Sequence, residues 1–238
     1  MVTSYTEDPD PHLLQKAKAA GLKIGLCAGA YQGECAADPQ SLLQLKEKVT
    51  HLVSLSPDEI WIDHLRFHGR WETEVKQLVD SHLPCQFCEN IDRKKIVASY
   101  FTEVKKLVPD TIKLGFFAAP FTTQEFPDYP QILGLDYQKI KDSVDMISPM
   151  LYHRAINKPP IYISAYVQYL HDLGYQHIVP IIQVKDMPDN LPDEYSVEEL
   201  EQAYQEAIKP PSAGVAIFTW DHALEKGKTE TVVELLSE

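Results

Sequence analysis

Short apolar runs alternate along this chain with longer segments of helical periodicity. The runs are rich in β-branched and aromatic residues, which is typical of strands buried on both faces of a parallel sheet. Between the runs, apolar residues recur every three or four positions, as in an amphipathic helix. The predicted strands are Leu22 to Leu26, Glu59 to Ile62, Ile112 to Phe117, Val144 to Ser148, His177 to Ile182 and Gly214 to Trp220. This alternation predicts an α/β fold.

Helix-boundary residues support the same pattern. Asp10 and Asp38 each precede a proline, an arrangement preferred where a helix begins. Ser196 and Glu199 have the spacing of a capping box, and Gly21 follows a predicted helix as a stop residue. Local signals therefore agree with the hydrophobic pattern.

The length suits a barrel. With 238 residues, 44% of them apolar, the chain approaches the roughly 250 residues of a (β/α)8 barrel. We expect a single domain of this type over residues 1–238. Because six strands are predicted and few residues precede Pro11, we expect the barrel to lack its first two strands. An open α/β sheet, or closure by the strands of a partner, is the alternative.

Charge excludes several partners. The chain has 22 Lys and Arg against 35 Asp and Glu, a formal net charge of -13, which repels nucleic-acid phosphates and anionic membrane surfaces. No apolar run reaches the roughly 18 residues of a membrane-spanning helix, and the first residues do not resemble a signal peptide. We expect a soluble protein that binds neither nucleic acid nor membrane. Its compartment and oligomeric state stay open.

The four cysteines are too few for a disulfide-scaffolded fold of this size. Cys85 and Cys88 form a C-x-x-C motif, but the sequence near it shows no second half of a zinc site. We interpret the motif as a local loop feature, with a metal or redox role as the alternative.

Two strand-end motifs resemble those of uncharacterised glycoside-hydrolase-like TIM barrels. They are Ile-Asp-His-Leu-Arg-Phe at residues 62–67 and Asp-Met-Ile-Ser-Pro-Met-Leu-Tyr at residues 145–152. Residues 17–23 and 214–220 are similar to that group's third and eighth strands, so the resemblance covers nearly the whole chain. It implies a glycoside hydrolase that cleaves a polysaccharide or oligosaccharide. The chain departs from the pattern at His64, where an aromatic residue is usual, and at residues 68–69, where a proline is common.

Active sites of such barrels lie at the carboxyl ends of the strands, so acidic residues there are the candidates. A carboxylate directly after a buried strand is costly unless it is paired or used, which favours Asp63. Arg66 can hold Asp63 ionised, or the two can form a structural ion pair. The acidic candidates are Glu34, Asp63, Asp186 and Asp221.

Glycoside hydrolysis needs two carboxylates, about 5 to 5.5 Å apart for retention or about 6.5 to 9.5 Å apart for inversion. Asp63 is the predicted nucleophile or base, and its partner is the general acid. We favour Asp221 as the partner, with Asp186 and Glu72 as alternatives. A barrel that lacks the second carboxylate would bind a glycan or a partner without cleaving it.

Aromatic residues near strand ends suit stacking against sugar rings, whereas Trp61, inside a strand, is expected to be core. The predicted substrate-binding residues are Tyr31, Arg66, Tyr152, His153 and Trp220, and Trp71 is a further aromatic residue near a strand end. Histidines also follow several strands, so a metal-dependent barrel hydrolase is a further alternative, but no His-x-His motif occurs at a strand end. No glycine-rich dinucleotide motif is present. We expect no catalytic metal and no cofactor.

Overall fold

The protein is described by a computed structural model that covers residues 2–4, 9–30, 35–72, 77–83, 85–187 and 193–237. Its chain forms two compact units. The first unit comprises Met1–Phe117 and Phe121–Met146, and the second comprises Ala118–Pro120 and Ile147–Glu238. Asp63 and Arg66 therefore belong to the first unit, whereas the predicted site residues from Tyr152 onward belong to the second.

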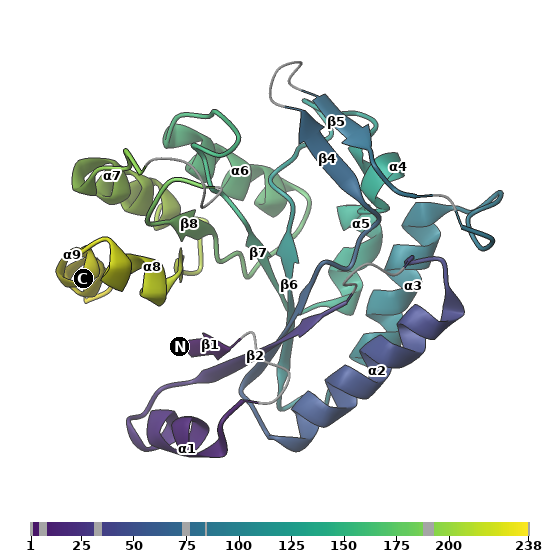
Figure 1. Ribbon diagram of the computed structural model, residues 1–238, viewed down its shortest axis with the longest axis horizontal. Helices are drawn as coiled ribbons and strands as arrows, with labels where there is room; N and C mark the ends of the chain where they lie inside the picture. Colours follow the sequence, from purple (N-terminus) through teal and green to yellow (C-terminus); the bar gives the residue numbers. More distant parts are fainter. Residues whose placement is uncertain are drawn as a thin grey trace. The chain divides into compact units, whose positions relative to one another are not determined.

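The first unit is built on parallel strands (Figure 1). Their order in the sheet is β1, β2, β3, β6. In the register, Gly29 lies beside Asp63 and Trp61 beside Gly115. The bounds of these strands are β1 Val2–Ser4, β2 Ile24–Gly29, β3 Glu59–Asp63 and β6 Lys113–Ala118.

Helices follow the strands in the first unit and begin as the sequence predicts. The Asp10 and Asp38 side chains accept hydrogen bonds from the N–H groups of His12 and Gln40, both at 2.9 Å. Figure 1 shows α2 and α3 side by side, and Lys46 of α2 pairs with Glu103 of α3 at 3.3 Å. The helices are α1 Pro11–Ala19, α2 Pro39–Ser54, α3 Arg93–Lys105, α4 Tyr129–Leu133, α5 Tyr137–Ile140 and the 3₁₀ helix η1 Lys141–Ser143.

An antiparallel hairpin lies between β3 and α3, where the sequence predicts only a long loop. Its strands are β4 Gly69–Glu72 and β5 Gln77–Asp80. Phe67, just before β4, is buried, and its N–H donates to the carbonyl oxygen of Leu133 at 2.8 Å. The chain between β3 and the hairpin is thus fixed against the helical layer of the unit.

The second unit contains further parallel strands and their helices. Strand β8 pairs with β9, and single parallel bridges join Ile147 to Ile178 and Met150 to Ile181. The Ser196 hydroxyl caps α7 by accepting the N–H of Glu199 at 3.2 Å, which confirms the predicted cap. The elements are β7 Met146–Pro149, α6 Ile161–Asp172, β8 Ile181–Gln183, α7 Val197–Ala207, β9 Ala216–Phe218, α8 Trp220–Glu225 and α9 Thr229–Leu235.

The predicted fold class is confirmed: the described strands are mostly parallel and alternate with helices. Each of the six predicted apolar runs contains or overlaps a strand. Three described strands were not predicted: β1, which pairs in parallel with β2, and the hairpin strands β4 and β5. No helix among the described residues is long and apolar enough to cross a membrane.

Candidate functional site

Asp63 is the last residue of β3, and its side chain is buried, with 3% of the residue exposed. Its backbone carbonyl accepts the N–H of Ala30 at 2.8 Å, which fixes the strand end beside β2. Its carboxylate accepts the N–H of His64 at 2.7 Å and lies 3.3 Å from His64 Nε2. The strand therefore ends in an oriented, buried carboxylate.

The backbone turns sharply directly after Asp63. His64 has φ of 55°, a left-handed conformation that is uncommon for residues other than glycine and that often occurs at functional sites. The turn leaves the His64 side chain 53% exposed, while Leu65 is buried. One face of the Asp63 carboxylate is thus bounded by a solvent-accessible imidazole.

Arg66 is half-buried and electrostatically linked to Asp63. Burial lowers the pKa of Arg66, and the negative charge of Asp63 acts in the opposite direction. Asp63 also pairs with His64. Arg66 thus lies near enough to Asp63 for their charges to interact, and its role toward the carboxylate stays a prediction.

In the second unit, Tyr152 and His153 follow β7 but differ in accessibility. The Tyr152 ring packs 5.3 Å from Phe218 and remains partly exposed. His153 is completely buried, and its Nε2 lies 3.3 Å from Glu199. Burial lowers the pKa of His153 despite the opposing effect of Glu199. His153 therefore exposes no surface in this conformation, and its predicted contact with a sugar stays a prediction.

Asp186 is engaged in a network of charges. Arg154 contacts both of its oxygens, Nε at 2.6 Å and Nη2 at 3.0 Å, and also donates to Glu199 at 2.9 Å. The N–H of Glu194 donates to Asp186 at 2.8 Å. The hydrogen bonds and charge of Asp186, with Glu199, raise the pKa of Arg154. A carboxylate held in a bidentate pair is poorly placed to give a proton to a leaving group. Arg154 is a member of this network that the sequence did not predict.

A buried lysine, Lys228, contacts residues at both ends of the segment between β8 and α7. Lys228 donates to the carbonyl oxygens of Val184, at 2.7 Å, and Tyr195, and it lies 3.6 Å from Asp193. Burial lowers the pKa of Lys228, and Asp193 opposes the change. This lysine fixes the described ends of the segment between β8 and α7.

Asp221 and Trp220 lie in the first turn of α8, directly after β9 and the capping residue Thr219. Asp221 is exposed, and Trp220 is 50% exposed. Asp221 forms no ion pair within the part of the chain that the structure describes. Both are therefore accessible from solvent.

The remaining candidates divide between described and undescribed residues. Tyr31 and Glu34 lie outside the described residues, as does the Trp71 side chain. Glu72 pairs with Arg70 at the hairpin and is largely occupied by that contact.

The cysteines form a cluster that the sequence analysis did not predict. Cys88 Sγ lies 3.1 Å from Cys85 Sγ, 3.3 Å from Cys35 Sγ and 3.1 Å from His82 Nε2. Cys35 Sγ lies 3.3 Å from the same nitrogen. The C-x-x-C motif of Cys85 and Cys88 thus lies beside two further potential metal ligands, Cys35 and His82. In the sequence, the spacing His82-x-x-Cys85-x-x-Cys88 was the feature that could have indicated this cluster.

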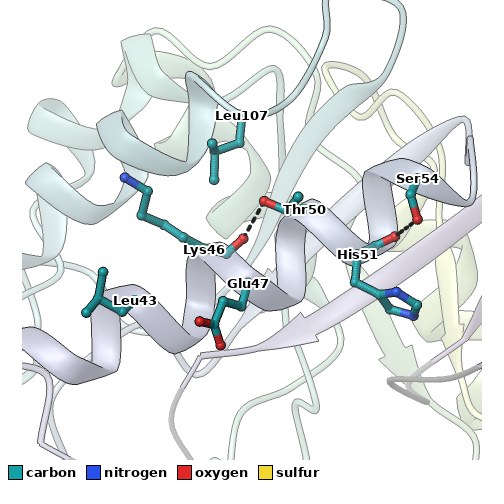
Figure 2. Close-up of a pocket in the computed structure, with 7 residues that line it drawn as sticks. All are labelled: Leu43, Lys46, Glu47, Thr50, His51, Ser54 and Leu107. Atoms are coloured by element: carbon teal, nitrogen blue, oxygen red, sulfur yellow. Dashed lines mark hydrogen bonds between the residues drawn. The ribbon is translucent and has the colours of Figure 1, made fainter.

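Two surface grooves lie among the described residues. One, of about 510 Å³, runs along α2 (Figure 2). Figure 2 shows Lys46, Glu47 and His51 directed away from the helix axis on this open face. Another, of about 600 Å³, is lined by residues of α6 and α7 and is strongly acidic. Neither groove is lined by the candidate residues named above.

The fold defines a class: an α/β protein of the TIM-barrel type with a glycoside-hydrolase-like fold. No protein-family model matches the sequence, and no curated protein matches it. Several solved structures match the fold of the chain. The glycoside hydrolase domain of PgaB (BpsB) from Bordetella bronchiseptica aligns over 94% of this chain and 78% of its own, with a TM-score of 0.66 and 10% identity.

Two further structures agree. The spore cortex-lytic enzyme SleL from Bacillus megaterium aligns over 94% of this chain and 62% of its own, with a TM-score of 0.61 and 10% identity. A β-glucuronidase from Bacteroides uniformis aligns over 92% of this chain and 26% of its own, with a TM-score of 0.61 and 9% identity. At these identities the likeness establishes the fold.

Proposed function

We propose that this protein is a glycoside hydrolase that cleaves a polysaccharide or oligosaccharide through carboxylate chemistry, without a cofactor in the hydrolytic step. The observation that supports the proposal most is Asp63: a buried, oriented carboxylate at the carboxyl end of a parallel strand. That is the position where barrels of this type place their catalytic groups. The solved neighbours that are glycoside hydrolases favour the same chemistry.

Asp63 acts as nucleophile or base. The His64 N–H donor fixes the direction of one carboxylate oxygen, and the exposed imidazole lies beside the other. Arg66 contributes positive charge near the carboxylate, and either role requires the ionised form of Asp63. His64 and Arg66 are positioning residues in this scheme.

The second carboxylate supplies the proton to the leaving group. Asp186 is a poor choice because Arg154 and the Glu194 N–H already occupy its oxygens. Asp221 is exposed and forms no ion pair among the described residues, so we assign it the role of general acid. A carboxyl group that is open to solvent can exchange protons after each turnover.

Trp220 supplies the sugar-binding surface. Its half-exposed indole follows β9 directly, and flat aromatic faces suit the C–H faces of pyranose rings. Tyr152, packed against Phe218, gives a second aromatic surface after β7. The net charge of -13 favours neutral or cationic glycans over highly anionic ones.

The proposal is tested by hydrolysis of a panel of chromogenic glycosides and oligosaccharides, with the wild type, Asp63→Asn and Asp110→Asn. Asp110 is an exposed aspartate just before β6, so it is a matched control. Wild-type turnover that is lost in folded Asp63→Asn and kept in Asp110→Asn supports the assignment. Turnover that survives in Asp63→Asn removes Asp63 from the mechanism.

A glycan-binding barrel without turnover is the second candidate. The pairing of Asp186 with Arg154 favours it, because one of the acidic strand-end candidates is already occupied. Saturable glycan binding that weakens in Trp220→Ala, together with no hydrolysis of any substrate, would identify this function instead.

A further inference from the structure

Three thiols and one imidazole meet in the first unit and have no part in the proposed hydrolysis. Cys35 lies between β2 and α2, whereas His82, Cys85 and Cys88 lie between the hairpin and α3. The Nε2 atom of His82 faces the sulfurs of Cys35 and Cys88, and its buried Nδ1 has no hydrogen-bond partner among the described residues. The polar contacts described for the imidazole are therefore both with sulfur.

We propose that Cys35, His82, Cys85 and Cys88 bind one Zn²⁺ ion in a tetrahedral structural site. Three thiolates and one imidazole nitrogen form a Cys₃His set, which soft sulfur donors make selective for zinc over magnesium or calcium. On binding, each thiol releases its proton to solvent, and three Zn–S bonds and one Zn–N bond form. Nothing is oxidised or reduced.

The distances fit zinc better than a disulfide. Zn–S bonds of about 2.3 Å in a tetrahedron place the sulfurs about 3.8 Å apart. The Cys85–Cys88 and Cys35–Cys88 sulfur distances are 3.1 and 3.3 Å, so these two pairs must widen by about half an ångström. Cys35, His82 and Cys88 have donor atoms within 4.8 Å of one another, and the Cys85 side chain, which touches Cys88, must turn toward His82 to complete the tetrahedron. A disulfide of about 2.05 Å would need a contraction of about 1 Å or more, and the cysteines are free thiols.

Hydrogen bonds fix Cys35 in place. Its carbonyl oxygen accepts the Ser41 hydroxyl at 2.9 Å, and its sulfur accepts the N–H of Ala37 at 3.2 Å. The buried Tyr100 hydroxyl, from α3, donates to the Ala36 carbonyl at 2.7 Å. Backbone N–H groups directed at a thiolate sulfur are typical of the surroundings of metal-bound cysteine.

His82 is fixed by a separate set of contacts. The backbone N–H of His82 donates to the Asp80 carboxylate at 3.0 Å, and Asp80 pairs with Arg93 of α3 at 2.9 Å. The edge of Phe67 packs on the imidazole, with ring centroids 5.1 Å apart. The cluster thus has preformed supports on both of its chain segments.

Four protein donors leave no open coordination position, so the role of the ion is structural. The ion joins the segment between β2 and α2, which contains Cys35, to the segment between β5 and α3, which contains the other three ligands. Because metal binding to such a site contributes directly to folding free energy, chelation should destabilise the protein. The site stands apart from the proposed function, and its test uses no hydrolytic activity.

The test measures bound metal in protein purified with a thiol reductant, and then titrates demetallated protein with Zn²⁺ and with Co²⁺. The variants are Cys88→Ala, which removes the thiol nearest the other donors, and Cys27→Ala as the matched control. Cys27 is a buried cysteine of β2 that belongs to no part of the cluster. The wild-type titrations stand without the variants if Cys88→Ala does not fold.

We expect about one equivalent of zinc per chain, intense visible absorption of tetrahedral thiolate-bound Co²⁺, and a lower melting temperature after chelation. Cys27→Ala should keep the ion, and Cys88→Ala should bind it at least about 100-fold more weakly. Less than about 0.1 equivalent after reconstitution with excess zinc, or a Cys85–Cys88 disulfide in reductant-treated protein, would overturn the proposal.

Discussion

The indole of Trp61 on β3 covers Gly115 on the neighbouring strand β6. The two residues are register partners, and a Cβ atom at Gly115 would lie 2.5 Å from Cζ3 of the indole. Phe117 stacks on the same ring, with centroids 5.2 Å apart. Trp61 is 1% exposed, which confirms that it is a core residue, as the sequence predicts.

Gly115→Ala should therefore lower the free energy of unfolding by about 1–3 kcal/mol, because the added methyl group overpacks the indole. Denaturation by urea measures the change. Trp61→Phe in the Gly115→Ala background should recover part of the loss, since the smaller ring vacates the contact. A Gly115→Ala protein as stable as the wild type would show that the contact is easily relieved.

Asp186→Asn should destabilise the second unit without a specific effect on hydrolysis. The substitution removes the charge that Arg154 contacts at 2.6 and 3.0 Å, at a cost of about 1–3 kcal/mol. For a chain of this length, each kcal/mol corresponds to about 2–4 °C in melting temperature. Asp110→Asn is the control. A stable Asp186→Asn protein with no activity would instead place Asp186 in the catalytic machinery.

Asp145 should make stability depend on acid pH. Burial acts to raise its pKa, but hydrogen bonds from the Leu114 N–H at 2.8 Å and Lys105 Nζ at 2.7 Å, with the Lys105 charge, lower it overall. A lowered pKa means stability that is present above the ordinary value of 3.8 and lost as pH falls through the folded value.

Asp145→Asn should thus lower the free energy of unfolding by about 1–2 kcal/mol near neutral pH, a value that allows for the partial exposure of Asp145. The difference from the wild type should become smaller below about pH 4. Urea unfolding of both proteins across pH 2.5 to 7 measures this, at about half-unit steps. A difference between the two proteins that stays constant with pH would exclude the proposed linkage.

Tyr100→Phe should loosen the segment that contains Cys35. Its hydroxyl donates to the carbonyls of Ala36 at 2.7 Å and Asp38 at 3.2 Å. We expect a loss of about 1–2 kcal/mol and about tenfold weaker zinc binding, measured by competition with a chelator. Tyr204→Phe, in α7, should change neither quantity. Unchanged zinc affinity in Tyr100→Phe would mean that the tyrosine supports the fold but not the metal site.

Features fixed by neighbouring residues were predictable from the sequence. Asp38 with Pro39 begins α2, and Ser196 with Glu199 begins α7, because capping depends on residues within one turn. The longer strands were also predictable, because each corresponds to an apolar run of neighbouring residues. Strand β1 escaped prediction because three residues form no recognisable run, and only pairing with β2 makes them a strand.

The partners of the site residues were not predictable, since they depend on contacts between distant segments. Arg154 precedes Asp186 by 32 positions, and nothing local links them. Cys35 and His82 are 47 positions apart and meet because β2 and β3 are neighbours. The position of Asp63 was predictable, because it needed only the end of one apolar run.

The most direct test of the account is the ratio of kcat/KM between wild type and Asp63→Asn on the best substrate of the panel. If the buried carboxylate is the nucleophile or base, the ratio should be about 10³ or more, with the melting temperature within a few degrees of the wild type. A folded Asp63→Asn protein that retains kcat/KM within about tenfold would contradict the central assignment.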